Sequence, residues 1–195
     1  QSFPSLEAVN QMIVACGAIP CAAWLDGTLP GEQAIEELME LLIGKGAAAL
    51  NIIPDRNWNI PDPEVRRVRL SNLYQVVDLA QKLEIPLNIG TEMNTFGQKL
   101  VDGFDQPELA PVRQAFIDGA YFIYGHTTMQ RVLGLGYQSD WASAYLPTRR
   151  AKNAFYTQIG RQIPPSPDGM RQLQDFSSGN NPAWVTPDLF LKMSA

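Results

Sequence analysis

The feature that most constrains the fold is a regular alternation of short apolar runs with longer segments of helical periodicity. The apolar runs begin near residues 19, 48, 86 and 120, so consecutive starts lie 29, 38 and 34 residues apart. A connection of this length holds a helix, and such connections join parallel strands by right-handed crossovers. The sequence therefore predicts an α/β fold built from consecutive βα units.

Four strands are expected, at residues 19–25, 48–53, 86–90 and 120–124. The first three runs are bounded by turn residues, and the fourth is rich in aromatic and β-branched residues. The fourth run has an alternative: a helix passing through Gly119 and Gly125 would also place Phe116, Phe122 and Ile123 on buried faces.

Helix signals lie between and after these runs. Ser5 and Asp62 stand where N-caps are expected, Pro63 follows Asp62 at the first helical position, and Gly17 provides a C-terminal stop. Helical periodicity is expected over residues 5–16, 34–42, 62–83, 111–118, 148–159 and 187–193. Residues 164–181, rich in Pro, Ser, Gly and Asn, are expected to form an irregular, mobile connection.

The number of units limits the architecture. A closed eight-stranded βα barrel uses about 250 residues, or about 31 per unit, so four units amount to half of one. The chain is therefore expected to form half of a TIM-like barrel, a small open sheet, or a sheet completed by another copy in a homo-oligomer. We expect a βα domain over residues 1–135 and an irregular helical extension over 136–195. Because the chain begins with Gln1, we also expect it to lack an N-terminal part.

Composition excludes several classes of partner. The 195 residues are 45% hydrophobic, which is enough for a core, and carry a net charge of -5, which disfavours nucleic acid and anionic membranes. No run approaches the roughly 20 apolar residues of a membrane span. The two cysteines, Cys16 and Cys21, do not form a disulfide framework, and a cytoplasmic location is expected.

Polar residues gather where the expected strands end. In parallel α/β sheets the loops after the strands open on one side and form the ligand face. The candidates at this level are Trp24 and Asp26, then Asp55, Arg56, Asn57 and Trp58, then Glu92 and Asn94, and finally His126. Asn51 and Asn88 add amides inside otherwise apolar strands, where they either orient a ligand or bridge strand ends.

Glu92 is the first choice for a general base or metal ligand, because Gly90 lets the backbone turn and places Glu92 at the strand mouth. Its structural alternatives are a cap of the segment 95–100 and an ion pair with Arg56. His126 is the only histidine, and an unperturbed imidazole titrates near neutral pH. At a strand end a functional and a structural role are equally supported, whereas a helix over residues 120–130 favours the structural role.

The segments Leu50–Asn57, Asn88–Asn94 and Tyr124–Thr127 resemble the later half of a metal-dependent hydrolase barrel, as in amidohydrolases and the polymerase-and-histidinol-phosphatase superfamily. The resemblance spans about residues 17–135. It implies a hydrolase of a small phosphorylated or hydroxylated substrate, with a divalent Mg, Mn or Zn ion held by Glu92, His126 and Asp26. The usual His-x-His pair of the first barrel strand is not in this chain, so the resemblance places it upstream of Gln1.

Within this resemblance, Glu92 and Asp55 are the catalytic candidates. The expected substrate-binding residues are Arg56, Asn57, Asn51, Asn88, Asn94, Trp24 and Trp58. Two alternatives stay open: a sugar isomerase or epimerase on the same barrel, and a non-catalytic small-molecule-binding or assembly module.

Overall fold

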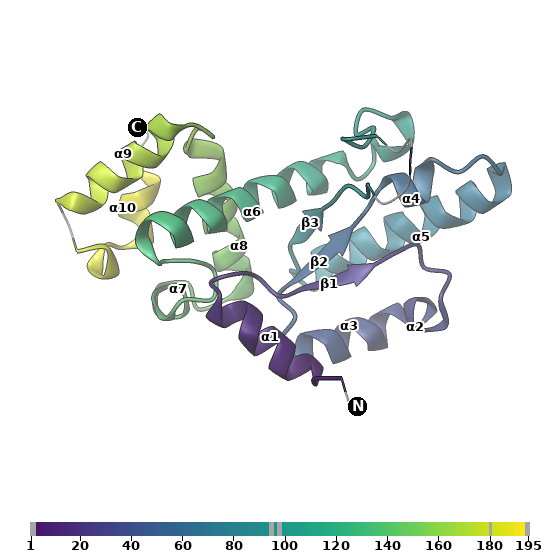
Figure 1. The fold of residues 1–195 in the computed structure, drawn as a ribbon, viewed down its shortest axis with the longest axis horizontal. Helices are drawn as coiled ribbons and strands as arrows, with labels where there is room; N and C mark the ends of the chain where they lie inside the picture. Colours follow the sequence, from purple (N-terminus) through teal and green to yellow (C-terminus); the bar gives the residue numbers. More distant parts are fainter. Residues whose placement is uncertain (1–2, 94–95, 97–98, 180, 194–195) are drawn as a thin grey trace. The chain divides into compact units, whose positions relative to one another are not determined.

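The computed structural model describes residues 3–93, 96, 99–179 and 181–193 (Figure 1). The elements in the first part of the chain are α1 (Leu6–Ala15), β1 (Cys21–Trp24), α2 (Pro30–Gln33), α3 (Ile35–Gly44), β2 (Ala49–Ile52), α4 (Asp55–Trp58), α5 (Pro63–Lys82) and β3 (Leu87–Ile89). They are followed by η1 (Pro107–Leu109), α6 (Arg113–Leu133), α7 (Asp140–Tyr145), α8 (Arg149–Gln162), α9 (Pro167–Ser178), η2 (Pro182–Trp184) and α10 (Pro187–Leu191).

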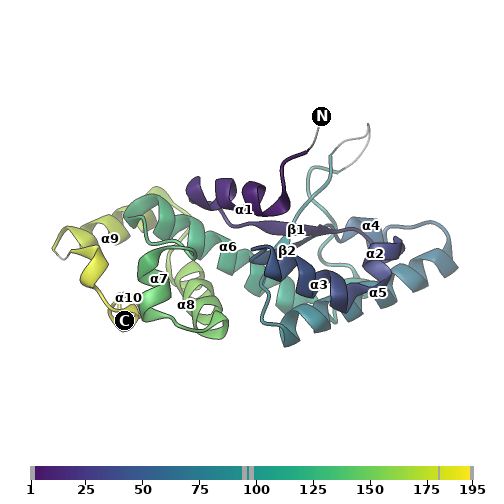
Figure 2. The same cartoon turned by 90° about the horizontal axis from the view of Figure 1, so that it is seen from below.

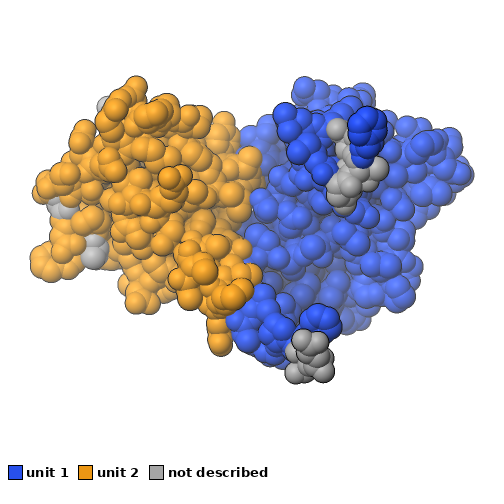
Figure 3. Space-filling view, viewed as in Figure 1, with its two compact units in different colours: residues 1–10, 20–117 blue, residues 11–19, 118–195 orange. Residues whose placement is uncertain are grey.

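The chain forms two compact units, which Figure 3 distinguishes by colour. Unit 1 comprises residues 1–10 and 20–117, and unit 2 comprises residues 11–19 and 118–195. Helix α6 begins in unit 1 and continues into unit 2. The sequence predicted a domain over residues 1–135 and an extension over 136–195, and this division stays a prediction.

Unit 1 contains a three-stranded parallel sheet in the order β1-β2-β3. Ala22 and Trp24 of β1 pair with Leu50 and Ile52 of β2, which pair in turn with Leu87 and Ile89 of β3. The three expected strands are therefore confirmed within one or two residues at their ends, and the α/β class with a small open sheet is confirmed.

The two faces of this sheet differ. Trp24, Leu50, Ile52 and Leu87 alternate onto one face and are buried in the core of the unit. Helices α3 and α5 lie on this same side of the sheet (Figure 2). Their buried side chains in the core are Met39 from α3 and Leu73, Val76, Val77 and Ala80 from α5. Burying each side chain of Leu or Ile size contributes roughly 1.5–3 kcal/mol, so this face supplies most of the unit's hydrophobic stabilisation.

The opposite face of the sheet carries small or polar residues. On this face Cys21 and Ala23 are exposed, Asn51 and Asn88 are half-buried, and Ala49 is buried. A strand with one covered and one open face is more typical of antiparallel sheets than of parallel ones. This open face therefore has less hydrophobic cover than the opposite face.

Two expected helix caps are confirmed. The Ser5 hydroxyl accepts a hydrogen bond from the Ala8 amide at 3.2 Å, and the Asp62 carboxylate accepts from the amides of Glu64 and Val65 at 2.9 and 3.0 Å. These bonds satisfy amide groups that have no partner within the first turn of a helix.

The expected fourth strand at 120–124 is wrong, because these residues lie in helix α6. The helical alternative buries Phe116 and Phe122, which are 6% and 1% exposed. Gly125 and Gly160 let α6 and α8 approach closely, since an added Cβ on Gly125 would lie 1.9 Å from the Tyr156 carbonyl oxygen. Helix packing in unit 2 thus overrides the β propensity of the aromatic and branched residues.

The expected irregular connection at 164–181 is also corrected, because α9 occupies residues 167–178. The Ser166 hydroxyl accepts from the Gly169 amide at 3.2 Å, and Pro167 stands at the start of the helix. Ser-Pro is here a cap followed by a favourable first helical residue. The short helix expected near 187 is confirmed as α10, where Phe190 is fully buried.

Within the described part of the chain, no helix combines the length and apolar character that a membrane span requires.

Candidate functional site

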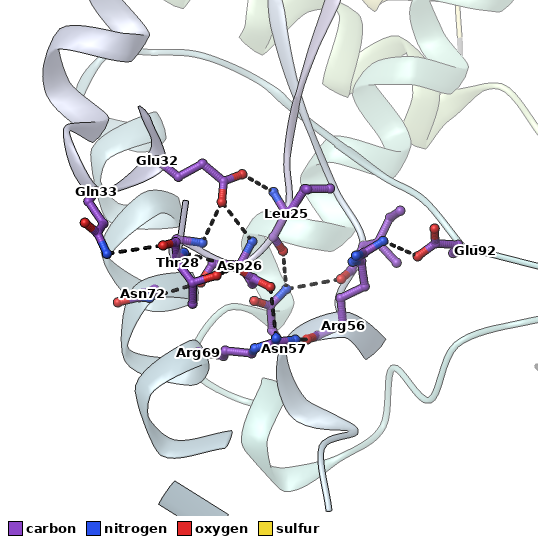
Figure 4. A network of polar contacts seen from close by, with 12 residues as sticks. Leu25, Asp26, Thr28, Glu32, Gln33, Arg56, Asn57, Arg69, Asn72 and Glu92 are labelled. Atoms are coloured by element: carbon purple, nitrogen blue, oxygen red, sulfur yellow. Dashed lines mark hydrogen bonds and ion pairs between the residues drawn. The ribbon is translucent and has the colours of Figure 1, made fainter. Parts of the chain in front are cut away.

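The loop after β1 is shaped by Glu32 of α2, a residue that is 8% exposed (Figure 4). It accepts hydrogen bonds from the backbone amides of Leu25 and Gly27 at 2.6 and 3.0 Å, and a longer one from Asp26 at 3.4 Å. Gly27 adopts a positive φ of 74°, which suits glycine. One buried carboxylate therefore determines the path of the chain at the mouth of β1.

Asp26 belongs to a network that joins three elements (Figure 4). Its Oδ2 lies 3.2 Å from Nη2 of Arg69 on α5, and Nη1 of Arg69 donates to the carbonyl of Arg56 at 2.9 Å. Asn72 of α5 donates to the Asp26 carbonyl at 3.0 Å. The predicted metal ligand Asp26 is thus held by a guanidinium, and its carboxylate fixes α4 and α5 relative to β1.

Asn57 joins the ends of β1 and β2. Its Nδ2 donates to the carbonyls of Leu25 and Ile53 at 3.1 and 3.2 Å, and its side chain is fully buried. Its Oδ1, like Arg69 Nε, is buried without a hydrogen-bond partner within the residues the structure describes. The structure therefore places Asn57 in the support of the site rather than on its surface.

A pocket of about 370 Å³ opens beside these loops. It is lined by Ile53, Asp55, Arg56, Asn59, Glu92, Phe96, Lys99 and Asp102. Three carboxylates and two cations thus share one cavity, next to the carboxyl ends of β2 and β3. This is the position at which parallel α/β sheets bind ligands.

Arg56 and Glu92 form an ion pair across the pocket, with Arg56 Nη1 2.7 Å from Glu92 Oε2. Their side chains are 35% and 23% exposed, so both groups remain reachable from solvent. The ion pair with Arg56 that was a structural alternative for Glu92 is therefore present. The same pair places a cation and an anion side by side at the pocket wall.

Asp55 is oriented by several donors. Its Oδ1 accepts from Trp58 Nε1 at 2.8 Å and from the Gly103 amide at 3.2 Å, while its own amide donates to Asp102 Oδ2 at 3.2 Å. Asn59 donates to Oδ2 at 3.4 Å. These donors hold the Asp55 carboxylate in one orientation, and they assign Trp58 a positioning role.

Asp102 is the most deeply buried carboxyl group of the pocket, with 7% of the residue exposed. Burial raises its pKa above the ordinary value, and the nearby Asp55 and Glu92 carboxylates add to the rise. The Asp55 amide and Lys99 oppose it. The pocket therefore pairs a carboxyl group that retains its proton to higher pH with a carboxylate that is surrounded by donors, an arrangement typical of acid-base chemistry.

Asn51 and Asn88 are brought together by the parallel register, in which they are direct partners. Asn88 Nδ2 donates to Asn51 Oδ1 at 2.8 Å. The two amides thus form a cross-strand pair on the open face of the sheet.

Trp24 and His126 do not line this pocket. Trp24 is 2% exposed in the core, Asn94 lies outside the described residues, and His126 lies in α6 within unit 2. His126 is buried, and its Nδ1 accepts from the Tyr137 amide at 3.0 Å. Burial lowers the His126 pKa. Its position in a helix removes the reason for assigning it to a strand end.

The predicted metal ligands do not by themselves fit an ion. Asp26 is bound to Arg69, Glu92 to Arg56, and His126 to the Tyr137 amide. Over residues 3–93, 96, 99–179 and 181–193, no cluster of three or more His, Cys, Asp or Glu side chains has the arrangement of a metal site. The metal stays a prediction of the resemblance.

Sequence reasoning missed Glu32, Arg69, Lys99 and Asp102. Each lies in a helix or a later loop rather than directly after a strand, and only the folded chain brings them to the strand ends. Asp102 carries one local signal, the glycine that follows it at Gly103.

Comparison of the chain with protein-family models, with curated proteins and with solved structures finds no match.

Proposed function

We propose that the chain provides the substrate-binding and acid-base residues of a hydrolase that acts on a small phosphorylated or hydroxylated molecule. The observation that carries the proposal is the strand-end pocket, in which Arg56 and Lys99 face three carboxylates. Convergent charged groups in a cavity at the carboxyl ends of parallel strands are typical of substrate sites.

Arg56 and Lys99 would hold an anionic or hydroxyl-rich group of the substrate. A guanidinium binds phosphate oxygens in a bidentate manner, and an ammonium group adds a point charge. Lys99 lies over the Trp58 ring, with Nζ 5.8 Å from the ring centroid, and Trp58 also orients Asp55. The binding and acid-base parts of the pocket therefore share one supporting side chain.

Asp102 and Asp55 would transfer the protons of hydrolysis. A water molecule attacks the ester centre and gives a proton to Asp55. Asp102 gives its proton to the leaving oxygen as the bond to the leaving group breaks. Asp55 thus gains one proton and Asp102 loses one. The raised pKa of Asp102 suits the acid, and the donors around Asp55 suit the base. Glu92 would orient Arg56.

The proposal is tested by phosphate release from glycerol 3-phosphate. Asp102→Asn removes the acid and is expected to lower kcat by about 100-fold, which is the size of a general acid-base contribution. Asp105→Asn is the matched control, since Asp105 is exposed and lies outside the pocket lining. Equal turnover in Asp102→Asn and the unchanged chain would contradict the assignment.

Metal dependence has its own test. A divalent ion would polarise the scissile group and lower the pKa of water. Elemental analysis of Mg, Mn and Zn after dialysis, with activity measured before and after chelation, separates an ion-dependent reaction from one driven by the pocket residues alone.

A non-catalytic binding role is the second candidate, because Glu92 already pairs with Arg56, one of the two cations that line the pocket. Tight binding of glycerol 3-phosphate without turnover, unchanged by Asp102→Asn and Asp55→Asn, would favour it.

A further inference from the structure

The open face of the unit 1 sheet carries a polar pair at its centre. Asn51 and Asn88 are registered partners, and one hydrogen bond of 2.8 Å joins Asn88 Nδ2 to Asn51 Oδ1. The pair therefore has a fixed orientation, with the remaining amide groups directed away from the bond that joins them.

One donor and one acceptor of this pair remain available. Asn51 Nδ2 and Asn88 Oδ1 have no hydrogen-bond partner among the described residues, and neither atom is among the buried atoms without partners. Both residues are half-buried. A donor and an acceptor held side by side match two neighbouring hydroxyl groups, because one hydroxyl can accept while the other donates.

The pair lies close to a residue of the strand-end pocket. Ile53, which lines that pocket, follows Asn51 by two residues along the chain, and Gly90 lies beside both. A Cβ added to Gly90 would lie 3.4 Å from Asn51 Oδ1 and 3.7 Å from Ile53 Cγ1, so glycine leaves this path open. Two residues of extended chain span roughly 7 Å, which is the length of a three-carbon phosphate.

We propose that the substrate carries two vicinal hydroxyl groups, which the Asn51–Asn88 pair binds while Arg56 and Lys99 hold the anionic end. The substrate class is then a polyol or sugar phosphate rather than a phosphate ester of an apolar alcohol. This inference rests on the proposed function, since it extends the same pocket along the open face of the sheet.

The test uses two probes that differ only in their hydroxyl groups. Glycerol 3-phosphate has a vicinal diol, and propyl phosphate has the same three carbons without it. Isothermal titration calorimetry on the whole chain is expected to give a Kd about tenfold lower for glycerol 3-phosphate, as two modest hydrogen bonds would produce.

Asn88→Leu and, separately, Asn51→Ser are expected to bring the Kd of glycerol 3-phosphate to within about twofold of that of propyl phosphate. Binding of propyl phosphate should be unchanged in both variants, which shows that the pocket is still folded. Equal affinity of the unchanged chain for the two probes overturns the inference and leaves the proposed function in place. Binding of neither probe overturns the proposed function itself.

Discussion

The two units place their polar and aromatic residues in opposite ways. Among the described residues, the buried acids Asp26, Glu32 and Asp102 all belong to unit 1, at the strand ends. Unit 2 instead has a core of aromatic rings and a single buried titratable imidazole, His126, in the part of the chain described.

The rings of unit 2 pack edge to face. Phe155 and Tyr156 have centroids 5.1 Å apart at an angle of 85°, and Trp141 and Phe190 have centroids 5.7 Å apart at 86°. Trp141 Nε1 donates to the Val185 carbonyl at 2.9 Å, so its polar atom is satisfied. Such pairs contribute about 0.5–1.5 kcal/mol beyond the area that they bury.

The difference shows where this chain accepts a thermodynamic penalty. A buried carboxylate is unfavourable unless donors surround it, whereas a buried ring pair is favourable in itself. Unit 1 keeps its acids buried at the strand ends, where a pocket opens, and this is the arrangement expected of a functional site. Unit 2 has the packing of a structural support.

The largest effect is expected in the helix packing of unit 2. Gly125→Ala places a Cβ 1.9 Å from the Tyr156 carbonyl oxygen, so α6 and α8 must separate. We expect the free energy of unfolding to fall by about 3 kcal/mol, at the upper end of overpacking effects. Urea denaturation measures it, and hydrogen exchange should increase in α6 and α8 before it does in the sheet.

Gly179→Ala is the matched control for this variant. Gly179 also belongs to unit 2, but an added Cβ would meet nothing within 4 Å, and its φ of -88° suits alanine. Its stability should change by less than about 1 kcal/mol. Equal destabilisation by the two substitutions would refute the close packing of α6 on α8.

The next effect concerns the buried acid of unit 1. Glu32→Ala leaves the amides of Leu25, Asp26 and Gly27 without their acceptor, and we expect a loss of about 2 kcal/mol, within the range for unsatisfied buried groups. Thermal denaturation measures the loss. Glu40→Ala on the exposed surface of α3 is the control, and a loss as small as that of the control would mean that Glu32 does not shape the loop.

The three strands could be predicted because their signal is local. Each combines a short apolar run with turn residues on both sides, and burial in a parallel sheet requires such a run. Asp62 and Ser5 were predictable for the same reason, since a cap acts within one turn of its own helix.

Helix α6 could not be assigned with the same certainty, because its residues favour a strand in isolation. What makes 120–124 helical is the contact of Gly125 with Tyr156 of α8, which lies 31 residues further along the chain. The place of His126 depended on this assignment. A local sequence pattern carries no information about which helix packs against the segment.

The candidate site was predictable only where it follows a strand directly. Asp55, Arg56 and Glu92 were found, and the structure brings all three to one pocket. Glu32, Arg69 and Asp102 act through contacts 5 to 47 residues away in sequence, and no spacing rule indicates such contacts. The burial of Asp102 beside Asp55 therefore follows only from the folded chain.

A smaller effect is expected from His126, and it tests whether unit 2 tolerates a buried charge. Its folded pKa lies below the ordinary 6.5 because of burial, so the stability it contributes is complete above pH 6.5 and is lost as pH falls towards the folded pKa. Protonation of Nδ1 also breaks the bond from the Tyr137 amide, and we expect a loss of about 1 kcal/mol between pH 7 and about pH 5.

His126→Asn is the matched variant, because Asn Oδ1 can accept in place of Nδ1 without titrating. Its free energy of unfolding should be lower at pH 7 but should change less between the two pH values. Identical pH dependence in the variant and the unchanged chain would assign the acid sensitivity to other groups.

The smallest effect has the opposite sign and concerns Asp102. Its folded pKa lies above the ordinary 3.8, so ionisation disfavours the folded state, and stability is lost as pH rises from 3.8 through the folded pKa. Asp102→Asn keeps an acceptor for the Asp55 amide and removes the charge, so we expect a gain of less than about 1 kcal/mol at pH 7 and none near pH 3. Chemical denaturation at the two pH values measures it, with Asp105→Asn as control. A variant that is both more stable and slower in turnover would show that Asp102 is kept for chemistry. A loss of stability at pH 7 would instead show that the charge of Asp102 supports the fold. That result would remove the contrast between the acids of unit 1 and the rings of unit 2.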